Sequence, residues 1–571
     1  MVRVSSTAIL ALTLSPVTSA SASAPAPAQP PAPSEFGPSA HHARENAAHI
    51  FNAVHSAMRQ WGSSIHHNGL AVIPATVPRG TMLFHGARGN STPEGFEWLA
   101  FEMEHSEGFA RSWRGGGRPA PRPPSKPGNG QPPTVLGVEG EGQRRLRDGD
   151  GKKPERPPPP PPPPMENMRG YFHTYRANRD LKLLYIDGMA AGKTDMGTPD
   201  TQDFLLGGVV DQPKFGEFER AGDICELVRS WGLDGVIRME IGFESIYCDF
   251  TDGLDLVSVL RRPWSEEWVS AGGMPMFEWA RAVGQRYDGI GGGRVRVGFG
   301  GMVSGLWYPV NVSNPARRDM PRLGRLEEGV REAMMERARE NAMGDKGGVV
   351  EWQGVVDMVV SRFADRIGAL AEEGEHGADE EGFVSQVLVV TNSWLMYPRD
   401  EYDVDVKGMV GDAEERCVRQ YLAPAEVARD EWTVEDGLIH AAVEAVLERI
   451  CGDLYSARGL LVEAAPKLAA AFSAEAMREA VDGTAGGELG EAVERARAVV
   501  KGLKEYLNWS GWKKCRPGCA VDEVCFVAMW PFGMKGDHYS PSCQNRTTME
   551  GRGRGARGGD EEGYWDWEPR P

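Results

Sequence analysis

The stretch LLYIDGMAAGKTDMG (183–197) joins an apolar run to a glycine-rich turn that ends in Gly192-Lys193-Thr194. A Walker-type phosphate loop needs another glycine five positions before Gly192, so that its backbone amides can surround a phosphate. Asp187 stands at that position, and its carboxylate would repel phosphate. A helix should also follow the lysine, but the next residues, TDMGTPDTQD, are rich in turn formers. The stretch therefore predicts a strand ending in a turn and argues against an ATP or GTP site.

The residues around this stretch predict one mixed α/β domain over 40–315. Its expected elements are a helix at 43–60, strands within 66–87 and 170–188, a helix at 215–232, a strand-rich segment at 234–250 and a strand candidate after Gly291. Residues 114–165 are rich in Gly, Pro and Arg and end in a run of prolines. Such a segment buries too little apolar surface to offset the entropy of ordering, so we expect a disordered insertion there.

Beyond Leu323 the pattern becomes helical, and long helices are expected over 324–510. One strand-like piece, FVSQVLVVTNSWLMY (383–397), interrupts them. Residues 511–545 contain four cysteines and predict a small disulfide-rich segment, and residues 546–571 predict a disordered tail. The expected fold class is therefore α+β, with a mixed α/β N-terminal domain and a mainly helical C-terminal region.

The first 24 residues have the layout of a secretory signal peptide. Arg3 precedes a short apolar stretch, and small residues then offer cleavage sites. No later window is long and apolar enough to span a membrane. The net charge of −18 argues against a nucleic-acid partner, because phosphate contacts need clustered Lys and Arg. We therefore expect a secreted protein without a membrane span.

In an exported chain the eight cysteines are expected to form disulfides rather than metal sites. Cys225 lies in a predicted helix and Cys248 in the strand that follows it, so this pair is expected to be bonded. Cys417 and Cys451 are expected to form a second bridge. Two more bridges are expected within the terminal segment, among Cys515, Cys519, Cys525 and Cys543. Four sequons give the candidate glycan sites Asn90, Asn311, Asn508 and Asn545.

Three motifs in the order TMLFHGARGN, EWLAFEMEHSEGFA and GFESIYCDF make residues 70–250 resemble the ADP-ribosyltransferase fold. The resemblance implies an NAD site. His85 would bond the nicotinamide ribose, Gly86 would let the backbone approach it, and Glu244 would stabilise the developing cation. Trp98 and Phe101 are alternative candidates to stack on nicotinamide, and Glu240 and Asp249 are rivals of Glu244.

A second resemblance covers most of residues 45–545 outside the insertion. Segments such as PEGFEWLAFEMEH and CAVDEVCFVAMWP are similar to a family of secreted proteins of filamentous fungi without an assigned activity. This resemblance supports export but supplies no mechanism. Two functions are therefore considered. The first is a non-catalytic extracellular protein that binds a cell-wall component or another protein. The alternative is an NAD-dependent ADP-ribosyltransferase or NAD glycohydrolase acting outside the cell.

Overall fold

The helices and strands come from a computed structural model that describes residues 35–566. Within that range it leaves out 114–167, 208–215, 266–275, 316, 318, 325, 345–347, 373–377, 397–405, 485–486 and 552–562. The expected signal peptide (1–24) and the expected insertion (114–165) therefore lie outside the described residues.

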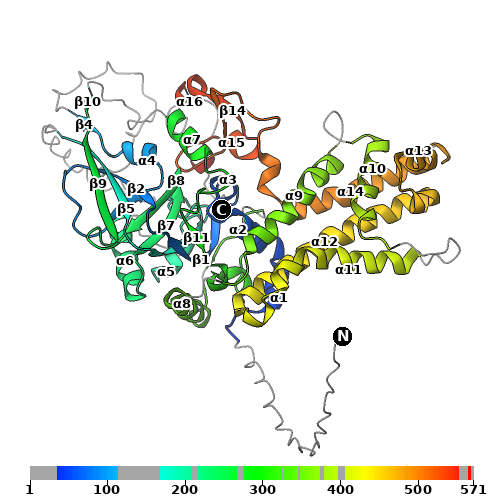
Figure 1. Cartoon of the computed structure of the whole chain (residues 1–571), viewed down its shortest axis with the longest axis horizontal. Coiled ribbons are helices and arrows are strands. Elements are labelled where there is room, and N and C mark those ends of the chain that lie inside the picture. Colours follow the sequence, from blue (N-terminus) through cyan, green and yellow to red (C-terminus); the bar gives the residue numbers. More distant parts are fainter. Residues whose placement is uncertain are drawn as a thin grey trace, which may run out of the picture. The chain divides into compact units, whose positions relative to one another are not determined.

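A ten-stranded mixed sheet forms the N-terminal half of the described chain, seen at the left of Figure 1. Its strand order is β11-β1-β6-β7-β8-β3-β2-β5-β9, and β12 pairs with β1. The strands are β1 (Asn68–Val77), β2 (Met82–Ala87), β3 (Glu97–Ala100), β5 (Tyr171–Ala177), β6 (Leu181–Gly188), β7 (Gly235–Glu240), β8 (Gly242–Tyr247), β9 (Leu254–Arg261), β11 (Arg296–Val297) and β12 (Val303–Ser304). The short β4 (Ser112–Trp113) and β10 (Trp264–Ser265) pair with each other.

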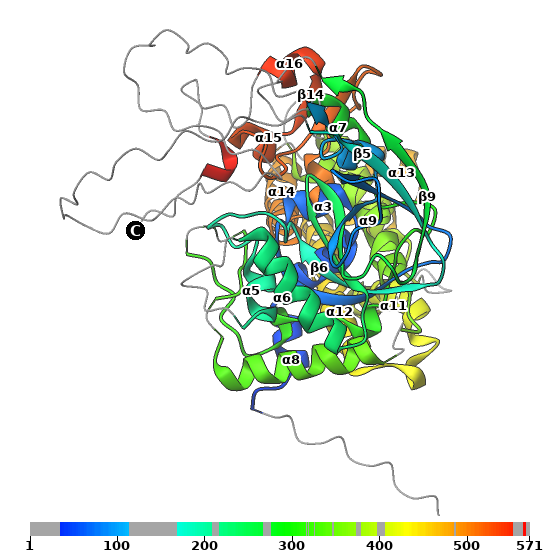
Figure 2. The same ribbon diagram turned by 90° about the vertical axis from the view of Figure 1, so that its left-hand side faces the viewer.

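The parallel pairing of β6 with β7 requires a crossover, and two helices provide it. They are α5 (Asp200–Leu205) and α6 (Glu217–Ser230), which lie beside each other over the sheet in Figure 2. The strand and turn predicted for 183–197 are present, since β6 ends at Gly188 and irregular chain leads on to α5. The crossover therefore brings the glycine-rich turn and the start of α6 to the same end of β6 and β7.

The C-terminal half is helical, as predicted for 324–510. Its helices are α8 (Glu328–Met343), α9 (Trp352–Ala371), α10 (Glu380–Asn392), α11 (Val406–Glu426), α12 (Val434–Ala464), α13 (Ala474–Asp482) and α14 (Glu488–Leu507). The long helix α12 begins with a capping box of Thr433 and Asp436 and packs against α11 and α14. No helix among the described residues is long and apolar enough to cross a membrane.

The two halves share one hydrophobic core. The N-terminal helices α1 (Ala40–Glu45) and α2 (Ala47–Ser56) pack on α12, and α3 (Gln60–Ile65) contacts β6. Phe51 of α2 stacks on Trp509, with ring centroids 5.8 Å apart. Buried residues of sheet and helices accordingly form one continuous cluster. The single helix expected at 43–60 is in fact three short ones.

Three further expectations need correction. Residues 383–392 belong to helix α10 rather than to a strand, because Phe383, Val387 and Val390 bury one helical face although valine favours strands. The tail expected to be disordered from 546 onwards contains α16 (Arg546–Gly551) and a turn in which Tyr564 is buried. The strand candidate after Gly291 is reduced to the two-residue strands β11 and β12.

Four disulfides are present. The two pairs expected from the sequence, Cys225–Cys248 and Cys417–Cys451, have Cα atoms 5.4 and 6.2 Å apart. In the terminal segment Cys515 bonds Cys525 and Cys519 bonds Cys543, beside the hairpin of β13 (Glu523–Phe526) and β14 (Ser542–Asn545). The first bridge ties α6 to the end of β8 and so fixes the helix that covers the site described next.

Candidate functional site

The β7–β8 hairpin places two glutamates and an arginine at one end of the sheet. Glu240 pairs with Gly242 and Arg238 pairs with Glu244, so the chain turns tightly through Ile241. Directly paired residues of antiparallel strands project from the same face, and Arg238 Nε donates a 2.8 Å hydrogen bond to Glu244 Oε1. Gly242 has φ +121°, which side chains rarely adopt, so glycine suits this turn.

His105 of the short helix α4 (Met103–Glu107) completes a cluster with both glutamates. Its Nε2 lies 3.7 Å from Glu240 Oε1 and 3.8 Å from Glu244 Oε2. The three residues are only 2, 6 and 5% exposed, respectively. Among the described residues, His105 Nδ1 has no hydrogen-bond partner, and the one ion-pair contact of the Glu240 carboxylate is with His105. We call His105, Glu240 and Glu244 the carboxylate–histidine cluster.

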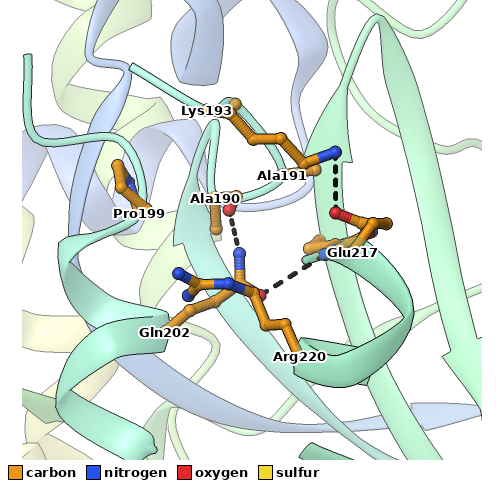
Figure 3. Close-up of a pocket in the computed structure, with 9 residues that line it drawn as sticks. Ala190, Ala191, Lys193, Pro199, Gln202, Glu217 and Arg220 are labelled. Carbon is orange, nitrogen blue, oxygen red and sulfur yellow. Dashed lines mark hydrogen bonds and ion pairs between the residues drawn. The ribbon is translucent and has the colours of Figure 1, made fainter. Parts of the chain in front are cut away.

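A chain of ion pairs connects this cluster to a surface pocket. Arg238 also forms an ion pair with Glu217, at the start of α6. Glu217 Oε2 in turn forms a 2.7 Å ion pair with Lys193 Nζ. Figure 3 shows Lys193 reaching across the pocket to Glu217 and Gln202 reaching the carbonyl oxygen of Ala190. The pocket is lined by Ala190, Ala191, Gly192, Lys193, Pro199, Gln202, Glu217, Arg220 and Arg238. The glycine-rich turn thus lines a pocket, although it is not a Walker loop.

Buried charges of both signs meet in this network. Lys193 and Arg238 lie among the three carboxylates of Glu217, Glu240 and Glu244. A third cation, Arg286, lies against the same turn, since a Cβ at Gly242 would be 3.2 Å from its Nη2, and it forms an ion pair with Glu102. The neighbouring Arg220–Asp203 ion pair is neutral as a whole. Burial and the nearby Glu240 raise the pKa of Glu244, although Arg238 acts in the opposite direction. Burial also acts to raise the pKa of Glu217, but Arg238 and Lys193 outweigh it and hold that pKa at about 2.

The structure does not bring His85 to Glu244, which corrects the expected NAD site. Phe84 pairs with Ala100, and Ala100 pairs with Glu244, so these three side chains share one face of the sheet. His85 follows Phe84 in β2 and therefore projects from the opposite face. There its Nδ1 lies 2.8 Å from the carbonyl oxygen of Trp98, and its ring packs 5.4 Å from Phe250. His85 is a buried core residue.

Gly86 and Phe101 also have structural positions. A Cβ atom at Gly86 would lie 2.3 Å from the carbonyl oxygen of Ser106 and 2.7 Å from the backbone nitrogen of Ala110, so glycine makes room for the end of α4 and the residues after it rather than for a ribose. Phe101 is completely buried. The alternative ring, Trp98, packs against Phe218 with centroids 5.0 Å apart. Of the four predicted NAD-site residues, only Glu244 belongs to the network.

Most of the residues that lie around Glu244 were not predicted from the sequence. Glu240 was predicted only as a rival of Glu244, and His105 was not predicted as a site residue. The available signal was the spacing of Glu240 and Glu244 around Gly242, which is compatible with a tight hairpin. Nothing in the local sequence indicated that α4, more than 130 residues earlier, would lie against that hairpin.

Comparisons with known proteins point to relatives without an assigned activity. Residues 41–276 match the family described as the YPL277C N-terminal domain, a span that contains the whole network. The chain is similar to the uncharacterized protein YOR389W of Saccharomyces cerevisiae, with 29% identity over 86% of this chain and 83% of the relative. It is also similar to the uncharacterized protein YPL277C of that yeast, with 41% identity over 38% of this chain and 43% of the relative.

These relatives support the resemblance to an uncharacterised family. No solved structure matches the chain, so the expected likeness to the ADP-ribosyltransferase fold has no support from known structures.

Proposed function

We propose that the protein is exported and acts outside the cell by binding a small cationic ligand in the network around Glu244. The observation that carries this proposal is the buried Glu240 carboxylate, which lies in that network without a cation at hydrogen-bonding distance. The resemblance to an uncharacterised family supplies no ligand, and the separation of His85 from Glu244 removes the geometric basis for the NAD site that the other resemblance implies. Binding a cell-wall component or an extracellular protein elsewhere on the molecule stays a prediction.

Burying charged groups is costly unless each charge is matched, and one unmatched charge typically costs several kcal/mol. Glu240 is 6% exposed, and its carboxylate lacks a cation in hydrogen-bonding contact. Folds keep such groups mainly where function requires them, and a buried carboxylate without a close counter-charge is a candidate ligand group. A bound cation would place a positive charge beside Glu240, and the chain of ion pairs from Lys193 to Arg238 links its site to the pocket.

Export is supported by the disulfides and by the expected signal peptide. All cysteines of the described chain are bonded, and disulfides of this number are typical of oxidising compartments. Two of the four sequon asparagines, Asn90 and Asn311, are exposed, whereas Asn508 and Asn545 are partly buried. Asn90 and Asn311 are therefore the better candidates for glycans in an exported protein.

The proposal is tested by comparing Glu240→Gln with Glu435→Gln in chelator-treated buffer. Glu435 is also buried, but Arg337 bonds it in bidentate fashion at 2.5 and 2.8 Å. Without a cation, removing the unmatched charge of Glu240 should leave the urea midpoint unchanged or raise it. Breaking the matched pair at Glu435 should lower stability by about 2 kcal/mol. Equal destabilisation by both variants would identify the network as a structural feature and overturn the proposal.

A further inference from the structure

We infer that His105, Glu240 and Glu244 together bind one divalent transition-metal ion. This inference rests on the proposed function, because it names the cation that the same network receives. It adds a metal centre to a chain whose sequence contains no recognisable metal-binding motif. The argument depends on the spacing of the donor atoms, their lack of other partners, their chemistry and the contacts that hold them.

The donor atoms are spaced for a shared ion. One ligand atom from each of the three residues lies within 4.8 Å of the others, and His105 Nε2 is 3.7 and 3.8 Å from the two glutamate oxygens. Two donors bound to one ion at about 2.1 Å with tetrahedral angles are roughly 3.4 Å apart. The separations of 3.7 and 3.8 Å are therefore a few tenths of an ångström larger than a bound ion would impose.

The donor atoms are also uncommitted. A separation of 3.7 Å is too long for a hydrogen bond, so neither Glu240 Oε1 nor Glu244 Oε2 is hydrogen-bonded to the histidine. Within the described chain, the buried Glu240 carboxylate has no other ion-pair or hydrogen-bond partner. The two carboxylates and the imidazole converge without hydrogen-bonding one another, and an ion placed between their ligand atoms would contact all three.

The chemistry of the donors selects the class of metal. Imidazole nitrogen is a good ligand for Zn²⁺, Fe²⁺ or Co²⁺, whereas Ca²⁺ and Mg²⁺ prefer sites made only of oxygen. One neutral imidazole and two carboxylates would also neutralise a divalent ion locally. Three protein ligands are the number typical of sites that keep an open coordination position, in contrast to closed structural zinc sites with four.

Surrounding contacts hold two of the ligands. Arg238 Nε binds the second oxygen of Glu244 at 2.8 Å, which leaves Oε2 directed at His105. Gly242 lies against the imidazole, since a Cβ built there would be 3.0 Å from His105 Nδ1. Orienting contacts of this kind are usual around metal ligands and strongly affect affinity.

Three other groups of ligand-type residues in the described chain provide a comparison. Two of them contain cysteines that are all in disulfides and cannot act as thiolate ligands. The third, His41, His42 and Glu45, is largely exposed on α1. Because exposed groups of this kind are common without a metal, this surface trio serves as the matched control.

The test is a titration of the full-length, metal-free protein with Co²⁺, followed by visible absorption and by equilibrium dialysis. We expect one tightly bound Co²⁺ per chain, displaced by Zn²⁺ but not by excess Ca²⁺. Glu240→Gln and His105→Gln should each weaken binding at least 10-fold and change the absorption spectrum. The double variant His41→Ala/His42→Ala should leave the tight site unchanged. Circular dichroism of each variant verifies folding.

Absence of a tight Co²⁺ site, or a site that both cluster variants leave intact, would overturn the inference. The result can be separated from failure of the proposed function. If Glu240→Gln maintains or raises the urea midpoint but Co²⁺ does not bind, the network receives another cation and only the metal assignment is wrong. If Glu240→Gln destabilises as much as Glu435→Gln and Co²⁺ does not bind, both proposals are wrong.

Discussion

Gly242 is the residue on which the geometry of the cluster depends most directly. It combines a backbone conformation that disfavours side chains with close contact to the ring of His105. The sequence could identify Glu244 because a glutamate opening a strand-rich segment is visible locally. It could not identify His105, whose role arises only when α4 packs on the β7–β8 hairpin. His85 and Gly86 were misassigned because a strand residue can project from either face, and only the register determines which.

A matched pair of glycine variants tests this residue-scale account. Gly242→Ala and Gly289→Ala both place a side chain at positive φ, +121° and +136°, and nothing lies within 4 Å of a Cβ at Gly289. Each variant should lose about 1–3 kcal/mol from backbone strain. Only Gly242→Ala should also weaken Co²⁺ binding, because its Cβ would displace His105. Calorimetric titration of both variants gives the comparison, and equal Co²⁺ affinities would contradict it.

Helix α6 and the β7–β8 hairpin are the elements that bring the network together. Helix α6 supplies Glu217, the hairpin supplies Arg238 and both cluster glutamates, and the Cys225–Cys248 bridge joins the two elements. This bridge was predictable, since a helix followed by a strand in one crossover packs on its own sheet. The prediction of a strand within 383–397 was wrong. It relied on the valine-rich composition, whereas the buried residues of this segment are spaced as in a helix.

Removing the Cys225–Cys248 bridge tests its role at the scale of the element. The variant Cys225→Ala/Cys248→Ala opens a loop with a sequence separation of 23 residues and should cost about 3 kcal/mol in urea unfolding. The control variant Cys515→Ala/Cys525→Ala should lower the free energy of unfolding by a similar amount, but it removes a disulfide in the terminal segment. We expect only the first double variant to weaken Co²⁺ binding. Equal effects on Co²⁺ affinity would show that the bridge does not position the network.

At the scale of the whole molecule, the sheet and the helices are joined through a continuous core. The division into a mixed N-terminal half and a helical C-terminal half was predictable from periodicity. The shared core was not, because the packing of α1 and α2 on α12 joins residues nearly 400 positions apart. The same core buries several imidazoles, which makes stability depend on pH.

Burial lowers the pKa of His55 and His85 to about 4 and the pKa of His66 and His67 to about 3, all below the usual 6.5. The folded protein keeps these rings neutral, whereas the unfolded chain protonates them below pH 6.5. Their contribution to stability is therefore lost as the pH falls from 6.5 toward 3.

Two buried carboxyl groups have the opposite effect on the pH dependence of stability, because burial raises the pKa of Asp187 to about 7 and the pKa of Asp200 to about 6. Near pH 5 the unfolded chain still binds about two more protons than the folded protein through these six groups. Stability should therefore fall by about 3 kcal/mol per pH unit there. Urea unfolding at pH 7, 6 and 5 measures this slope. A free energy of unfolding that stays constant or rises below pH 6 would contradict it.

The most direct test of the central claim is an anomalous difference map from crystals of the protein grown with Co²⁺, recorded at the cobalt absorption edge. We predict one strong peak between His105 Nε2 and the facing oxygens of Glu240 and Glu244, with metal–ligand distances of about 2.0–2.2 Å. A peak confined to the exposed histidines of α1, or a map without a peak at the cluster, would contradict the account.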